Sequence, residues 1–249
     1  MSRAERTGGG RGRLGQTLSS VAVAVGCVLF LGGFVWAAVL YQPYTVPTDS
    51  MAPTVRAGDR VLAERVDGDE VRRGDVVVFL DPLWGNMPVA KRVVGVGGDT
   101  VKCCDEQGKL TINGEPVDEP YLLQRERASF TVFEATVPEG QLFLLGDHRD
   151  ESLDSRTHLE DANNGSVPRE AVTGRIDATV WPPGNAGMIE RPAGFADLPG
   201  GVSRPGPLAA TLLAITAGAA LIFGGAAYGA IGSVRGKRAG LTHNGGTHG

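Results

Sequence analysis

The chain has 249 residues, a formal net charge of −4 and a hydrophobic fraction of 42%. This composition is neither basic nor strongly biased, so it excludes a disordered, collagen-like or nucleic-acid-coating chain. Three cysteines are too few for a disulfide framework.

The first predicted element is a long apolar helix near the N-terminus. No charged residue occurs from Leu14 to Thr48, and Leu18–Leu40 is almost purely apolar. A helix of this length rises about 34 Å, which is enough to cross a bilayer core of about 30 Å. The apolar run is also longer than that of a cleaved signal peptide, the main alternative. We therefore predict a basic tail over 1–16 and an uncleaved membrane span over 17–41.

Residues 42–182 are predicted to form a mainly β domain with long loops. Helical periodicity is scarce there, and short valine-rich runs alternate with Gly, Asp and Pro. Leu110–Val117 predicts two short strands around an Asn113-Gly114 turn. The other predicted strands are Arg60–Ala63, Asp75–Leu80, Val89–Val96, Thr100–Lys102, Gln141–Leu145 and Ala178–Trp181.

The cysteines and histidines of the chain predict no metal site. His148 and His158 are expected on surface loops, and no carboxylate–histidine spacing typical of zinc is present. Nor is there a glycine loop that would bind a nucleotide cofactor. Cys103 and Cys104 are adjacent, and a ring disulfide, a reduced pair and pairing between chains all remain open. Cys27 is expected to pack inside the first helix.

A second apolar segment follows the β domain. Twelve of the 26 residues from 182 to 207 are Gly or Pro, so 183–207 is predicted to be a linker that returns the chain to the membrane. We predict a second membrane span over 208–231 rather than a buried core helix, and a basic tail over 232–249. Gly225 and Gly229 within this span form a small-xxx-small pair that would admit a closely packed helix.

The charges predict how the chain crosses the membrane. Each tail carries a net charge of +3, whereas residues 42–207 carry 17 basic and 27 acidic residues, a net charge of −10. Basic residues that flank membrane spans stay in the cytoplasm. We therefore predict that both termini are cytoplasmic and that the β domain is extracytoplasmic.

A serine directly after the first predicted span is the first candidate for chemistry. Ser50 lies between Pro47 and Pro53, which restrict the backbone on both sides of it. Taken alone, such a serine is more typical of a turn.

A lysine on a predicted strand is the second candidate. Alternation places Lys91 on the same apolar face as Val89 and Val93, with Arg92 on the other face. Lysine rarely lies on an apolar face, and burial lowers its pKa from about 10.4 by up to about 3–5 units. A neutral amine near pH 7 is a general base. The alternative is a lysine that reaches solvent or pairs with Asp75.

The third candidate for chemistry is Gly146–Arg156, a dense run of acids, bases and serines. It directly follows the predicted strand that ends at Leu145. Asp147 and Arg149, like Asp154 and Arg156, lie two residues apart, which suits a loop braced by its own ion pairs. The alternative is a solvated charged loop.

Together these three elements resemble the bacterial type I signal peptidases, also called Ser–Lys leader peptidases. The similar segments run in the family's order from about residue 42 to 182: Thr48–Thr54, Gly58–Val61, Gly74–Val77, Lys91–Gly95, Gly98-Asp99, Gly146–Arg156, Gly165–Pro168 and Gly174-Arg175. Two positions depart from the pattern, since Thr48 stands for a usual Ser and His148 for a usual Asn.

The resemblance implies a β catalytic domain of the fold shared with self-cleaving repressors, flanked by two transmembrane helices. It implies that Ser50 is the nucleophile and Lys91 the general base, and that Ser152 orients the lysine amine. The Thr48 hydroxyl and the Ser50 backbone N–H would form the oxyanion hole.

The implied substrate is a translocated preprotein whose signal peptide is cut after a small-x-small sequence such as Ala-x-Ala. The candidate pocket residues are Val46, Pro47, Met51 and Ala90, and the candidate structural supports are Asp147, Arg149, Asp154 and Arg156. The expected partners are signal peptides, the lipid bilayer and the secretion translocon, with no nucleic acid and no cofactor.

Two other interpretations remain from the sequence. One is a serine–lysine enzyme of the self-cleaving repressor type, against which the two predicted spans argue. The other is a membrane-tethered β domain without activity, against which the intact Ser50, Lys91 and Ser152 argue.

Overall fold

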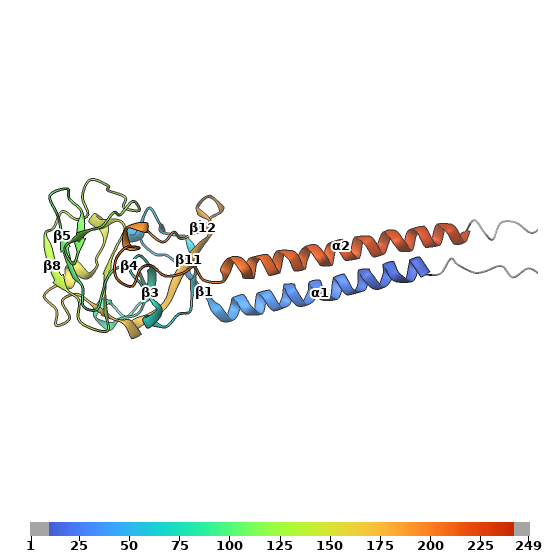
Figure 1. Ribbon diagram of the computed structural model, residues 1–249, viewed down its shortest axis with the longest axis horizontal. Helices are drawn as coiled ribbons and strands as arrows, with labels where there is room; N and C mark the ends of the chain where they lie inside the picture. Colours follow the sequence, from blue (N-terminus) through green and yellow to red (C-terminus); the bar gives the residue numbers. More distant parts are fainter. Residues whose placement is uncertain (1–9, 242–249) are drawn as a thin grey trace, which may run out of the picture. The chain divides into compact units, whose positions relative to one another are not determined.

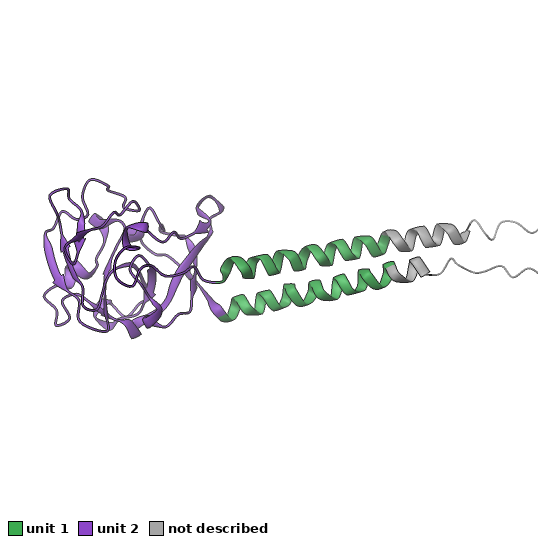
Figure 2. Ribbon diagram, viewed as in Figure 1, with its two compact units in different colours: residues 1–39, 207–249 green, residues 40–206 purple. Residues whose placement is uncertain are grey.

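The computed structural model describes residues 10–241, with side chains over 15–230, so the outer parts of both predicted tails lie outside the described residues. The chain divides into two compact units, shown in Figure 2. One unit holds the helices α1 (Gly10–Leu40) and α2 (Leu208–Leu241), which Figure 1 shows side by side. The other comprises residues 40–206 and contains all twelve strands of the described chain.

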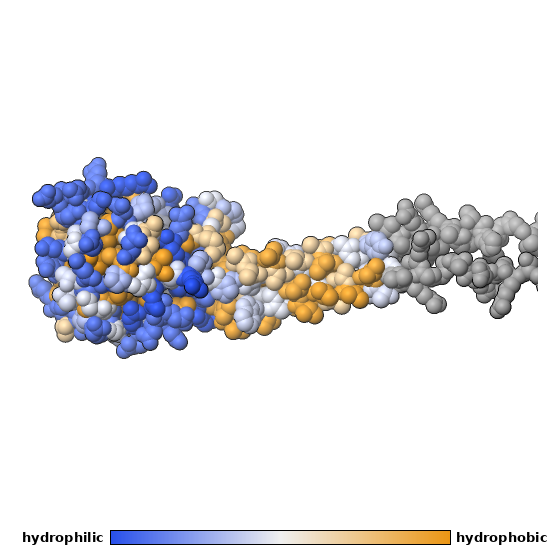
Figure 3. Space-filling view, viewed as in Figure 1, coloured by the Kyte–Doolittle hydropathy of each residue, from blue (hydrophilic) through white to orange (hydrophobic). Residues whose placement is uncertain are grey.

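The helical unit is apolar on its outside, as Figure 3 shows. Gly15–Leu40 and Leu208–Ala230, with mean hydropathies of 2.4 and 2.0, are long and apolar enough to cross a membrane. The helices approach closely where glycines face the partner helix. Ser19 Oγ donates a 2.7 Å hydrogen bond to the carbonyl oxygen of Gly225, and a Cβ added to Gly229 would lie 2.7 Å from Ser19 Oγ. The Gly225/Gly229 pair therefore faces α1.

The β unit consists of two antiparallel sheets, which confirms the mainly β prediction. The larger sheet has the order β1-β2-β11-β3-β4-β9-β10, with β12 added to β11, and the smaller has the order β7-β6-β5-β8. The strands of the larger sheet are β1 (Tyr41–Thr45), β2 (Arg60–Glu64), β3 (Val76–Phe79), β4 (Val89–Val96), β9 (Gln141–Leu145), β10 (Val167–Pro168), β11 (Val172–Trp181) and β12 (Gly187–Met188). Those of the smaller sheet are β5 (Thr100–Cys103), β6 (Leu110–Ile112), β7 (Glu115–Pro116) and β8 (Phe133–Thr136).

Each predicted strand overlaps an observed strand, and the predicted turn joins β6 to β7. Asn113 has a φ of 55° and Gly114 a φ of 88°, the left-handed conformations that a two-residue hairpin of type I′ requires. The sequence did not predict strands β1 and β8 or the two-residue strands β10 and β12. The residues of β1 continue the uncharged run of the first helix, so nothing in the hydropathy marks where the helix ends.

The two sheets enclose a common core through β4 and β5. The register between β4 and β9 shifts between Val93 and Gly95, where a Cβ on Gly95 would lie 2.5 Å from Val101 of β5. The missing side chain allows the sheets to approach, and Val101 packs in one cluster with Phe133 and Phe143. This packing brings the end of β9, and the polar loop that follows it, next to β4.

The structure differs from the linker expected over 183–207. This segment adds β12 to β11, and it buries Ile189 and Phe195 in two of the hydrophobic clusters. Arg191 forms a 2.6 Å ion pair with the fully buried Asp177 of β11 and donates to Ser203 Oγ over 3.0 Å. The segment is part of the β unit because a few apolar and charged side chains anchor it. The high Gly and Pro content of the segment gives no sign of these anchors in the sequence.

Candidate active site

Ser50 lies on a single 3₁₀ turn, η1 (Asp49–Met51), which follows β1. Thr48 precedes the turn in an extended conformation, with a φ of −135°. Met51 is fully buried and anchors the turn, and its carbonyl oxygen accepts from the Val55 N–H over 3.0 Å. Buried backbone anchors of this kind hold a short turn in one place, so the Ser50 side chain has a defined position.

Lys91 lies in the middle of β4, opposite Val77 of β3. Its Nζ donates a 2.8 Å hydrogen bond to Ser50 Oγ, a contact between residues 41 positions apart. Lys91 is 3% exposed and Ser50 9% exposed. The alternative in which Lys91 reaches solvent or pairs with Asp75 is excluded, because Lys91 is buried and Asp75 accepts instead from Ser203 Oγ and the Arg72 N–H.

Burial changes the acidity of this lysine. Removal of the ammonium from water lowers the pKa of Lys91 from 10.5 to about 8. The carboxylates of Asp154 and Asp147 oppose this shift, and the guanidinium of Arg156 adds to it. The amine is therefore much closer to neutrality near pH 7 than an exposed lysine.

The polar loop after β9, residues 146–156, packs against the turn that carries Ser50. The His148 N–H donates a 3.1 Å hydrogen bond to the carbonyl oxygen of Ser50. Gly146 allows this approach, since a Cβ there would lie 2.5 Å from the same carbonyl oxygen and closer still to Ser152 Oγ. Ser152 Oγ is buried and has no hydrogen-bond partner among the described residues. The structure thus brings Ser152 beside the serine turn but shows no hydrogen bond between it and Lys91.

The remaining predicted site residues divide into two groups. Thr48 is exposed and donates from Oγ1 to Ser50 Oγ over 3.2 Å. Val46 and Met51 are buried in one hydrophobic cluster, and the half-buried Ala90 packs against it. Pro47 is exposed. Three of the four candidate pocket residues therefore share one cluster.

The predicted ion pairs of the polar loop are half right. Asp154 pairs with Arg156 over 2.8 Å, as expected. The expected pairing of Asp147 with Arg149 is wrong. Asp147 receives two hydrogen bonds, of 2.8 and 2.6 Å, from Arg92, and Arg149 pairs with Glu119 over 2.5 Å. The partners come from other segments because the loop is folded against β4 and the 118–132 connection rather than extended in solvent.

Arg92 is a structural residue that the sequence analysis missed. It is 1% exposed, and its guanidinium lies 3.9 Å from the centre of the Tyr121 ring. Its main partner, Asp147, lies 55 positions away in the sequence, so the sequence alone gave no sign of the pair. His148 is also buried, at 9% exposure, so the expectation of a surface position for it is wrong.

Among residues 10–241, no group of three or more His, Cys, Asp or Glu side chains is arranged to hold a metal ion.

Comparisons with known proteins identify the family of this chain. The family model described as signal peptidase, peptidase S26, matches residues 15–181. Signal peptidase I of Mycobacterium tuberculosis (strain H37Rv) is 30% identical over 241 residues, which cover 76% of this chain and 81% of that protein. Signal peptidase I of Bacillus licheniformis is 32% identical over 188 residues, which cover 72% of this chain and 94% of that protein.

A solved structure is also similar. The crystal structure of a signal peptidase I from Enterococcus faecalis V583 has 32% sequence identity to this chain and a TM-score of 0.35. The match covers 42% of this chain and 94% of that one. Because the family model spans more than half of the sequence, this chain belongs to the signal peptidase family, peptidase S26, and is a serine endopeptidase that cleaves signal peptides.

Proposed function

We propose that Ser50 is the nucleophile of this peptidase and that Lys91 is its general base. The observation that carries the proposal is the 2.8 Å contact between Lys91 Nζ and Ser50 Oγ inside a buried site. A serine hydroxyl is a weak nucleophile at its own pKa and needs an adjacent base. Serine–lysine pairs are a known variant of the serine protease triad.

The protonation state of Lys91 suits this role. With a pKa of about 8, about a tenth of the lysine is neutral at pH 7. In the neutral form the hydrogen bond reverses, and Ser50 O–H donates to the amine lone pair. As Oγ bonds to the scissile carbonyl carbon, Lys91 takes the proton and then passes it to the leaving amine. Water attacks the resulting acyl-enzyme in the same way and releases Ser50.

Two donors support the oxyanion that forms during the attack. The Ser50 backbone N–H and the Thr48 hydroxyl are our candidates, because Thr48 Oγ1 lies 3.2 Å from the attacking oxygen. Ser152 is our candidate for orienting Lys91. A buried hydroxyl without a partner costs about 1–3 kcal/mol, which favours a hydrogen bond to the lysine once the substrate is bound.

The edge of β4 offers a place for an extended substrate. Strand β9 begins to pair with β4 only at Arg92, so Val89–Lys91 pair with β3 alone among the described strands. A peptide that adds to this edge would form main-chain hydrogen bonds beside the Ser–Lys pair. The cluster that contains Val46, Met51 and Ala90, together with the exposed Pro47, is our candidate for the small apolar pockets that select a small-x-small sequence.

The two apolar helices suit a substrate that emerges from a bilayer. We propose that 17–41 and 208–231 span the bacterial cell membrane, that both termini are cytoplasmic, and that the β unit acts on the outer side beside the translocon. The net charges of the tails and of the middle region support this orientation. Anchoring raises the effective concentration of a membrane-bound signal peptide at the site without any new contact.

Purified full-length protein, assayed with a labelled preprotein, tests the proposal. Ser50→Ala and Lys91→Ala should each abolish cleavage, and Lys91→Arg should do the same because a guanidinium stays protonated. Ser166→Ala, at a buried serine of the same unit, is the matched control. The mass of the products identifies the cleaved bond. Normal cleavage by either alanine variant would overturn the assignment of the pair.

A further inference from the structure

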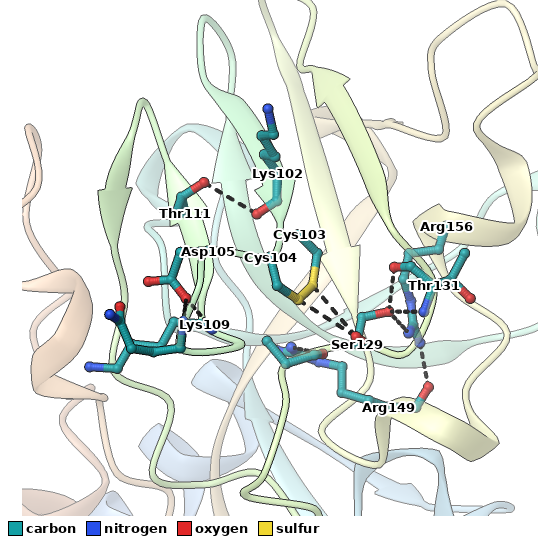
Figure 4. The surroundings of a disulfide bond; sticks show 12 residues. Lys102, Cys103, Cys104, Asp105, Lys109, Thr111, Ser129, Thr131, Arg149 and Arg156 are labelled. Atoms are coloured by element: carbon teal, nitrogen blue, oxygen red, sulfur yellow. Dashed lines mark hydrogen bonds between the residues drawn. A yellow bond between two sulfur atoms is a disulfide. The ribbon is translucent and has the colours of Figure 1, made fainter.

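The segment Ala128–Thr131 lies between the cysteine pair and the polar loop of the active site. Figure 4 shows this arrangement, with Cys103 and Cys104 on one side of Ser129 and Arg156 on the other. None of the motifs similar to the signal peptidases includes this segment. Its contacts nevertheless lead to Arg156 and Asp154, whose charges act on Lys91.

The first contact joins the segment to the cysteines. Cys103 and Cys104 form a disulfide, which selects one of the three states that the sequence left open. Their sulfur atoms lie 3.7 and 3.5 Å from the carbonyl oxygen of Ser129. A disulfide has no S–H to donate, so the sulfur atoms act here as a packed surface beneath this carbonyl group. Cys103 is fully buried in the same cluster as Ala128.

The second contact joins Ser129 to the arginine of the loop. Ser129 is 2% exposed, and its hydroxyl accepts a 3.0 Å hydrogen bond from Arg156 Nη1. The hydroxyl also bonds the backbone of Thr131, which holds it in one orientation. The neighbouring carbonyl oxygen, of Ala128, accepts from Arg149 Nη1 over 2.6 Å. The segment thus accepts hydrogen bonds from both arginines of the loop, Arg149 and Arg156.

Arg156 in turn pairs with Asp154, the carboxylate that raises the pKa of Lys91 most. Its guanidinium bonds both oxygens of Asp154, each over 2.8 Å. Asp154 also accepts from the Gly146 N–H over 3.0 Å, where the loop begins. The charged groups that act on Lys91 are Asp154, Asp147 and Arg156, all from this loop. A displaced Arg156 would leave Asp154 less neutralised and so favour the protonated lysine.

We propose that Ser129 is a positioning residue for the Ser–Lys pair and that the Cys103–Cys104 disulfide holds it in place, so that reduction of this bond lowers peptidase activity. The inference rests on the roles of Ser50 and Lys91 proposed above. The reductant is a dithiol, either a small molecule or a thioredoxin-like protein outside the membrane. Two electrons and two protons pass to the cysteines, the S–S bond breaks, two thiols form, and the dithiol becomes a disulfide.

Reduction changes the surface on which Ser129 rests. The ring that links the two cysteines opens, and each sulfur gains an S–H that is a weak donor to the Ser129 carbonyl oxygen. The position of Ala128–Thr131 then depends on two separate thiol side chains rather than on a closed ring. Arg156 loses the fixed acceptor that orients it, and the expected result is a slower reaction with an altered pH dependence.

Substitution of the serine provides the first test. In full-length enzyme, Ser129→Ala should lower kcat by about tenfold, because a hydrogen bond to a charged group is lost. It should also move the rising limb of the pH–rate profile to higher pH. Asp154, less neutralised by Arg156, then raises the pKa of Lys91 further than in the unmodified enzyme. Ser129→Thr retains the hydroxyl and should restore most of the activity. Ser166→Ala should change neither quantity. An unchanged pH profile in Ser129→Ala would reduce Ser129 to a structural role and overturn the proposal.

Reversible reduction of the intact cysteine pair provides the second test, and a double variant of the pair complements it. In a Cys27→Ser background, which removes the other cysteine, thiol titration should find no thiol before treatment with dithiothreitol and two afterwards. The kcat should fall on reduction and recover on reoxidation, and the Cys103→Ser/Cys104→Ser double variant should resemble the reduced enzyme. Free thiols in the untreated enzyme, or full activity after verified reduction, would overturn the role of the disulfide. Activity that survives Ser50→Ala would instead refute the proposed Ser–Lys pair, so the two failures are distinguishable.

Discussion

The His148 N–H donates a hydrogen bond to the carbonyl oxygen of Ser50 over 3.1 Å, which ties the polar loop after β9 to the turn that carries the serine. Neither residue uses its side chain in this contact, so the identity of residue 148 matters less than the path of its backbone. This backbone contact is available to a histidine at position 148, where the family resemblance led us to expect an asparagine. It also makes the lack of a side chain at Gly146 essential, because the loop must pass close to Ser50.

Gly146→Ala should abolish activity. The added Cβ would lie 2.5 Å from the Ser50 carbonyl oxygen, well inside van der Waals contact, and closer to Ser152 Oγ. The loop must move away, and the serine turn loses its backbone partner. Gly184→Ala is the control, because a Cβ there meets nothing within 4 Å. Cleavage assays on both purified variants check the prediction, and comparable rates in the two would contradict it.

Thr48→Val should lower kcat by about 100- to 1,000-fold, the usual cost of removing one oxyanion donor. The hydroxyl lies 3.2 Å from Ser50 Oγ and Thr48 is exposed, so the variant should fold normally. Thr48→Ser, which retains the hydroxyl, should remain active. Steady-state kinetics on a peptide substrate measure the effect, and equal kcat values for the valine and serine variants would refute an oxyanion role.

Lys91→Met should increase the free energy of unfolding while abolishing activity. The folded-state pKa of Lys91 is about 8 and the unfolded value is 10.5, so the unfolded chain binds more protons between these values. Stability therefore rises with pH across that window, and below it the buried lysine costs about 3 kcal/mol. Methionine removes this cost. The stability gain should be largest below pH 8 and should vanish by about pH 11.

Thermal unfolding of the detergent-solubilised enzyme across pH 6–10 measures this gain. Lys102→Met, at a side chain that is 55% exposed, is the control and should show no such pH dependence. The peptidase activity of the unmodified enzyme should rise with pH through about 8. Equal gains in stability at all pH values would show that the buried charge is not the cause.

Arg191→Ala should destabilise the β unit by up to about 3 kcal/mol at neutral pH, because it removes the closest cation from the buried Asp177, which keeps only the longer 3.6 Å contact with Arg175. Arg191 lies 2.6 Å from Asp177 and 3.3 Å from Asp75, both fully buried. Burial already raises the pKa of Asp75, so this carboxyl group takes up a proton easily once Arg191 is absent. The deficit should therefore shrink as the pH falls.

Denaturant unfolding at several pH values checks this prediction, with Arg204→Ala at an exposed position of the same segment as the control. A negligible loss at neutral pH would mean that Arg191 does not hold the 183–207 segment to the sheet. If Arg204→Ala lowers the free energy of unfolding as much as Arg191→Ala does, the loss comes from disturbing the segment in general and not from breaking the ion pair.

The sequence by itself determined the features that are local in the chain. The lengths of the apolar runs predicted the two helices, alternation predicted the strands and the inward position of Lys91, and Asn113-Gly114 predicted a hairpin turn. The family resemblance rested on short motifs, each within a few residues. These features follow from periodicity and backbone preference, which neighbouring residues express without any distant partner.

The tertiary structure decided which distant groups meet. The Lys91–Ser50 contact, the pairing of Arg92 with Asp147 in place of Arg149, and the anchoring of Arg191 all join residues from different elements. Buried charges and hydroxyls need partners, but many candidates satisfy that need in the sequence. Strand register and the close approach allowed at Gly95 and Gly146 select among them, and these depend on the packing of the whole β unit.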